Sequence, residues 1–99
     1  MVETIWTYRV KPGRRDEFER RYAASGDWAR LFAKANGYQG TRLLRDQREA
    51  GRYATVDCWA SVEDLDAFKK QFAKAYEELD QVCEELTIEE KHVGVFESA

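Results

Sequence analysis

Three side chains in this sequence could move a proton to or from an aromatic substrate: the carboxyl of Asp57, the phenol of Tyr76 and the imidazole of His92. Asp57 is the least expected of them, because it falls in the middle of a predicted strand and strands are poor in aspartate. A buried carboxylate needs a partner, so Asp57 is either ion-paired with Arg9 or Arg42 from a neighbouring strand, or an acid or base in a pocket. His92 is the only histidine and lies in the last predicted strand, where a structural role is the alternative to catalysis.

Aromatic side chains could form the walls of a pocket around such a group. Oxidation of a phenol by O2 needs a dry aromatic pocket, a proton acceptor and donors to the developing oxyanion. The candidate substrate-binding residues are Trp6, Tyr8, Trp28, Phe32, Trp59, Phe68 and Phe72. The same residues could instead be hydrophobic core, because aromatic rings dominate burial in small domains.

The sequence carries no motif for a metal or a cofactor, and we expect neither. It has no phosphate-binding glycine loop, no nucleophile elbow and no spacing of metal ligands. Cys58 and Cys83 lie far apart without CxxC spacing, which favours two free thiols in a reducing cytoplasm over a disulfide.

Length and charge limit the classes of protein and partner. Ninety-nine residues predict one domain, spanning residues 1–99. Sixteen basic and nineteen acidic residues give a net charge of −3, and the basic residues are scattered, so we expect no nucleic-acid partner. No apolar stretch approaches the roughly 20 residues of a membrane span, so we expect no membrane partner and a cytoplasmic protein.

Hydrophobic periodicity predicts the elements that would position these residues. Alternation indicates strands at residues 3–10, 38–46, 52–59 and 89–96. Helices are predicted from Pro12-Gly13 to about Ser25, after a cap at Asp27, and after a cap at Ser61. The last of these carries an apolar stripe from Leu65 to Leu86 and is either one long helix or two helices with a slight kink. The order predicts an α+β, ferredoxin-like βαββαβ fold with an antiparallel sheet.

Both faces of this sheet are too apolar to lie in water. One is marked by Ala54, Val56, Cys58, Val93 and Val95, and the other by Trp6, Tyr8, Tyr53, Trp59 and Phe96. Helices can cover only one face, so the other would expose a larger apolar patch than monomers usually tolerate. We therefore predict a homodimer packed sheet to sheet about a two-fold axis.

Several short motifs, in their order and spacing, resemble the antibiotic biosynthesis monooxygenase domain family over nearly the whole chain. They are Val10-Lys11-Pro12-Gly13 with Phe18, Gly37-Tyr38-Gln39-Gly40-Thr41 with Leu43-Leu44, Arg52-Tyr53 through Trp59 with Ser61, then Phe68, Tyr76, Leu79, Leu86-Thr87 and Gly94. The resemblance implies a dimeric α+β barrel with a pocket between helices and sheet in each subunit. Characterised members oxidise polyphenolic or quinone-forming aromatics with O2, without metal or flavin.

A related branch of that family binds and degrades haem, using a histidine on the long helix, an asparagine in the first strand and a tryptophan ending the third. Trp59 matches the tryptophan, whereas Trp6 stands nearest the asparagine and Tyr76 nearest the histidine. The leading hypothesis is a cofactor-independent monooxygenase acting on a small aromatic or quinone-type metabolite. The alternatives are a non-catalytic dimeric module that binds a small hydrophobic or aromatic ligand and, less favoured because it lacks the iron ligand, a haem-binding or haem-degrading protein.

Overall fold

The computed structural model describes all 99 residues and contains four strands, four α-helices and one 3₁₀ turn. In chain order these are β1 (Val2–Val10), α1 (Arg15–Tyr22), α2 (Asp27–Phe32), β2 (Tyr38–Arg45), β3 (Arg52–Trp59), α3 (Val62–Gln71), α4 (Ala73–Cys83), η1 (Glu84–Leu86) and β4 (Thr87–Phe96). No helix is long and apolar enough to cross a membrane.

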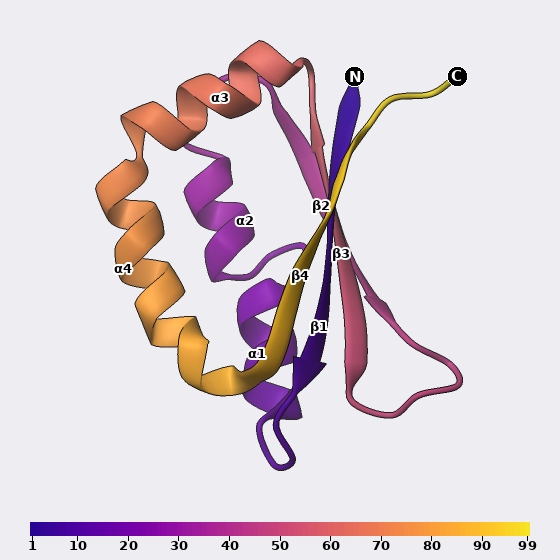
Figure 1. Cartoon of the computed structure of the whole chain (residues 1–99). Helices are drawn as coiled ribbons and strands as arrows, with labels where there is room; N and C mark the ends of the chain where they lie inside the picture. The colour runs from indigo at the N-terminus through magenta and orange to yellow at the C-terminus, as the bar shows by residue number, and fades with distance from the viewer.

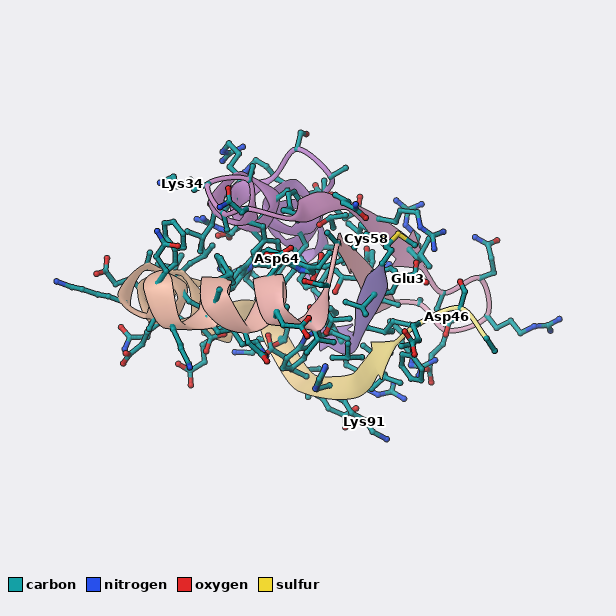
Figure 2. All side chains as sticks on the ribbon, turned by 90° about the horizontal axis from the view of Figure 1, so that it is seen from above. Glu3, Lys34, Asp46, Cys58, Asp64 and Lys91 are labelled. Carbon is teal, nitrogen blue, oxygen red and sulfur yellow. The ribbon has the colours of Figure 1, made fainter.

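The strands form one antiparallel sheet in the order β2-β3-β1-β4, and all helices lie on one of its faces (Figure 1). This arrangement confirms the predicted α+β, ferredoxin-like fold. The opposite face, here called the outer face, carries no helix. Figure 2 shows Glu3 and Cys58 on this side, turned away from the helices.

The two helices between β1 and β2 are shorter than predicted. α1 ends at Tyr22, and Gly26 rather than Asp27 is the N-cap of α2. Asp27 is the first residue inside that helix, where its carboxylate binds Arg21 at 2.6 Å and Arg30 at 2.9 Å. A negative charge in this first turn still stabilises the helix through its dipole.

The predicted long helix is divided at Phe72 into α3 and α4. Ser61 caps α3 as predicted, accepting a hydrogen bond from the Asp64 amide at 3.1 Å. Phe72 leaves the helical conformation (φ −112°, ψ 24°), and α4 then descends steeply from α3 (Figure 1). The turn is sharper than the slight kink considered from the sequence, and it lets both halves of the stripe reach the core. Two positions of the stripe remain exposed, Ala75 and Val82, the latter at 51%.

A bulge in β4 changes which of its residues face the helices. His92 pairs with Trp6 and Gly94 pairs with Ile5, so Val93 is an extra residue between them. Beyond the bulge, Val95 pairs with Thr4 on the helix side, and Phe96 pairs with Glu3 on the outer face. The predicted faces of Val95 and Phe96 were therefore wrong, because one inserted residue inverts the alternation.

The core lies between the helices and the inner face of the sheet. Its fully buried side chains are Phe18, Trp59, Phe68, Cys83 and Leu86. Cys58 and Cys83 are both free, one on the outer face and one in this core.

Candidate functional site

A cavity of about 260 Å³ lies between the helices and the inner face of the sheet. It resolves the question left open by the sequence, which could not show whether this space is hollow or filled. Eleven residues line it: Trp6, Tyr8, Tyr22, Trp28, Phe32, Thr41, Thr55, Asp57, Tyr76, Asp80 and Glu90. Its volume is near the lower end of the range for small-molecule sites, so it suits a small ligand.

The cavity brings together six of the ten candidate site residues, which come from the strands β1 and β3 and the helices α2 and α4. Those on the wall are Trp6, Tyr8, Trp28, Phe32, Asp57 and Tyr76. The aromatic members also contact one another; the rings of Trp28 and Tyr76, for example, meet edge to face with centroids 4.9 Å apart. Such packing holds the walls in place and keeps this part of the cavity apolar.

The other four candidates lie outside the cavity wall. Trp59 and Phe68 are sealed in the core at 0% and 1% exposed, and Phe72 packs against that core at the helix break. His92 lies on the exposed part of β4, where its Nε2 is 3.0 Å from Thr4 Oγ1 and its ring lies 4.7 Å from Trp6. None of these four touches the space that a ligand would occupy.

Asp57 is buried without an ion pair. Its direct neighbours across the sheet are Thr4 on β1 and Thr41 on β2. Arg42 instead pairs in register with Val56 on the outer face, where its nearest carboxylate is Glu3 at 3.9 Å. Arg9 is likewise on that face and binds Glu49 and Glu89. The predicted Asp57–arginine pair is therefore wrong, because an offset of one residue places the arginines on the opposite side of the sheet.

One oxygen of the Asp57 carboxylate is held and the other is free. Thr41 Oγ1 donates to Asp57 Oδ1 at 2.6 Å, and Tyr38 donates in turn to Thr41 Oγ1 at 2.6 Å. No protein group donates to Asp57 Oδ2, and this oxygen is not sealed from solvent although the residue is only 7% exposed. Burial raises the pKa of Asp57 to about 6, partly offset by the Thr41 hydrogen bond.

Two tyrosines on the wall are poor proton acceptors. Tyr8 shares a hydrogen bond with Thr55 at 3.0 Å, and burial raises its pKa. Burial also raises the pKa of Tyr76 to about 12, so its phenol stays protonated at neutral pH. These hydroxyls can donate to a ligand oxygen, whereas Asp57 is the group suited to accept a proton.

Two further carboxylates flank the cavity where it meets solvent. Asp80 on α4 and Glu90 on β4 are exposed residues that also line it. Partial burial raises the pKa of both carboxyls, and the charge of Asp80 adds to the rise at Glu90. The wall contains no lysine, arginine or histidine. No group of three or more His, Cys, Asp or Glu side chains is arranged to hold a metal ion.

Five wall residues were not among the candidates predicted from the sequence. They are Tyr22, Thr41, Thr55, Asp80 and Glu90. Asp80 could have been found, because it lies four residues after Tyr76 and so one helical turn along the same face. Glu90 likewise lies two residues before His92 and shares its side of the strand.

The family model for antibiotic biosynthesis monooxygenase matches residues 1–82, most of the chain. This protein belongs to the antibiotic biosynthesis monooxygenase family. The match covers β1 through α4 and therefore every wall residue of the cavity except Glu90. No curated protein sequence matches the chain significantly.

Solved structures of other proteins share this family's fold over the whole chain. SnoaB from Streptomyces nogalater, a cofactor-independent oxygenase, is 24% identical with a TM-score of 0.77, covering 99% of this chain and 92% of its own. A variant of MhuD, solved with two manganese protoporphyrin IX molecules per active site, is 26% identical with a TM-score of 0.75, covering 99% and 94%. One of these proteins is a cofactor-independent oxygenase and the other holds metalloporphyrins, so likeness of fold does not assign a function to this chain.

Proposed function

We propose that this protein is a cofactor-independent monooxygenase that oxidises a small phenolic substrate with O2. The observation that carries the proposal is the free oxygen of a buried carboxylate, Asp57 Oδ2, on the wall of an aromatic cavity. Membership of the family supports an oxygenase, and the residues of this chain supply what that chemistry needs from a protein.

In the proposed mechanism the aromatic walls exclude water and hold the ring, while Asp57 removes the phenolic proton. Thr41 fixes the carboxyl by donating to Oδ1, so Oδ2 is presented to the substrate. With a pKa of about 6, Asp57 is largely ionised at pH 7.5 and still basic enough to share a proton with a bound phenol. Tyr76 remains protonated and can donate to the oxyanion that forms.

The anion that results is the reductant for O2. It gives one electron to O2, and the superoxide and substrate radical combine to form a C–O bond at the ring carbon opposite the phenolate oxygen. Asp57 returns its proton to the peroxide, and loss of water leaves a quinone. One atom of O2 enters the product and the other becomes water, so the four electrons all come from the substrate and no external reductant is needed.

Haem fits this cavity poorly. The only histidine, His92, lies outside the wall, and the residue nearest the expected iron-binding position, Tyr76, is held protonated by burial. Three carboxylates and no cation line the cavity, so the propionates of a porphyrin would meet like charges. We therefore derive no step through haem.

Oxygen consumption tests the proposed function. Purified protein with 1-naphthol is expected to consume one O2 per naphthol and to release 1,4-naphthoquinone, with one labelled oxygen from 18O2. The same rate with EDTA present would support a metal-free reaction. Binding of naphthols without any oxygen uptake across a panel of phenols would instead support the ligand-binding alternative.

The rate should depend on the ionisation of Asp57. Below pH 6 this carboxyl is protonated and cannot accept the phenolic proton, so kcat/KM is expected to rise with pH through an inflection near 6 and then level off. The profile should be measured with a phenol whose own pKa lies well above 9. An inflection that persists in Asp57→Asn would contradict the assignment.

We also propose that the outer face of the sheet pairs with a second copy. Its centre is apolar, with Ile5 and Val56 directly opposite each other, and Leu44 and Phe96 are 43% and 46% exposed on the same face. Val56 is already buried by its neighbours at 5% exposed, whereas Ile5 is half-buried. Ile5, Leu44 and Phe96 thus stay partly uncovered within one subunit, and pairing about a two-fold axis would bury them.

Replacing Leu44 with lysine tests the dimer. Lysine at a half-exposed position near Arg42 should fold normally but repel its symmetry mate, so light scattering at about 10 µM should change from dimer to monomer mass. Val82→Lys is the matched control, because Val82 is 51% exposed on the helical side. A wild-type protein of monomer mass would contradict this part of the proposal.

A further inference from the structure

The charges on the cavity wall specify more about the ligand than the family does. All three ionisable side chains on the wall other than tyrosine are acids: Asp57 at the buried end, and Asp80 and Glu90 at the opening. No lysine, arginine or histidine shares the wall. A ligand that carried a carboxylate would meet unbalanced negative charge wherever it lay.

The buried end presents an acceptor without a donor. Asp57 is 7% exposed, and its Oδ2 takes no hydrogen bond from the protein. This oxygen is open to the cavity, so a ligand that displaces solvent from it must offer a donor, and a hydroxyl is favoured over a group that only accepts hydrogen bonds. A phenolic hydroxyl satisfies this requirement.

The open end requires a cation. Asp80 reaches the opening from α4 and Glu90 from β4, so the two carboxylates come from opposite layers of the fold. The two carboxylates line the same opening, so their like charges repel each other there. A cation between them would remove this repulsion, and the ring of Tyr76, one helical turn before Asp80, adds an aromatic face beside it.

We propose that the preferred substrate is a hydroxyaromatic amine, with its phenol at Asp57 and its protonated amine between Asp80 and Glu90. This inference rests on the proposed function for the role of Asp57, but it makes a separate claim about charge at the opening. Tyr76 shares the wall of the cavity with the acids at both ends. The ring of the substrate would accordingly lie against Tyr76 and Trp28.

Three phenols with the same ring and similar length test the claim by calorimetry at pH 7.5 and low salt: tyramine, tyrosol and 3-(4-hydroxyphenyl)propionate. Their tails are cationic, neutral and anionic. Tyramine is expected to bind about tenfold tighter than tyrosol, about 1.4 kcal/mol, and the propionate to bind more weakly than tyrosol. Raising the salt concentration to about 0.3 M should narrow the differences, because exposed charges are screened.

The variant Asp80→Asn/Glu90→Gln should bring the tyramine and tyrosol affinities to within about twofold of each other. Its matched control is Glu78→Gln/Glu89→Gln, which removes the same charge from exposed positions on α4 and β4 outside the wall and should keep the tenfold preference. Circular dichroism checks that both variants fold.

Any of three results would overturn the inference. The propionate could bind as tightly as tyrosol or more tightly, or the amine preference could survive in Asp80→Asn/Glu90→Gln. The third is that none of the three phenols binds. These binding results do not depend on turnover. Oxidation of 1-naphthol by a protein without the amine preference would leave the proposed function standing, whereas an amine preference without oxygen uptake on any phenol would overturn only the oxygenase.

Discussion

Replacing Asp57 with asparagine is expected to lower kcat for phenol oxidation about 100-fold or more. Asparagine keeps the shape and can accept the hydrogen bond from Thr41 Oγ1, but it cannot take a proton from the substrate. General-base groups typically contribute 10²- to 10⁴-fold, which sets the expected loss. Initial rates of oxygen uptake at pH 7.5 measure it, with Asp66→Asn on the exposed side of α3 as the control that should keep full activity.

The same variant should be more stable than the wild type at pH 7.5. The pKa of Asp57 is about 6 in the folded protein, above its ordinary value of 3.8, so the folded state binds more protons between these values. Stability from this group is therefore lost as pH rises from about 4 to 6, and a neutral amide should recover up to about 3 kcal/mol above pH 6. A variant that was inactive because it misfolded would show the opposite change in urea unfolding.

Replacing Trp59 with alanine is expected to lower the free energy of unfolding by about 3–5 kcal/mol. The side chain is fully buried, and its ring packs against those of Phe32, Tyr38 and Phe68 with centroids 5.3–5.8 Å apart. Its removal would leave a cavity in the centre of the core. Urea denaturation measures the loss, and for a domain of this size Tm should fall by more than about 12 °C.

Trp59→Phe separates the loss of packing from the loss of the indole N–H. Trp59 Nε1 is buried and has no hydrogen-bond partner, so phenylalanine keeps much of the ring contact and removes an unsatisfied donor. We expect this variant to lose less than about 1.5 kcal/mol and to bind naphthols as the wild type does. Impaired binding in a stable Trp59→Phe would return Trp59 to the substrate-binding residues, as first predicted from the sequence.

The elements were predictable because each depends on local patterns. Alternation located all four strands, and Ser61 with the acids after it marked the start of α3. The sequence pattern did not locate the break between α3 and α4 at Phe72, because no proline or glycine marks it. The break follows from packing, since it lets Phe68 on α3 and Tyr76 on α4 pack against the same core.

The candidate site was predicted in part for the same reason. Alternation along β3 placed Asp57 on the face of Tyr53 and Trp59, which is the helix-covered face. It could not show that Trp59 is sealed in the core while Asp57 borders a cavity, because both positions have the same pattern. Nor could alternation show that Arg42 lies on the opposite face of the sheet from Asp57. The faces of these two side chains depend on the register between β2 and β3 to within one residue.

The sequence by itself determined the family, the order of the elements and the chemistry available on β3, since these follow from residue types and short spacings. Only the tertiary structure decided that the space under the helices is hollow, and that a carboxylate rather than an arginine–carboxylate pair borders it. It also brought Asp80 on α4 and Glu90 on β4 to one opening, a contact between two elements that no local pattern predicts. Register across strands and the break between helices set these contacts, and both arise from packing between residues far apart in the chain.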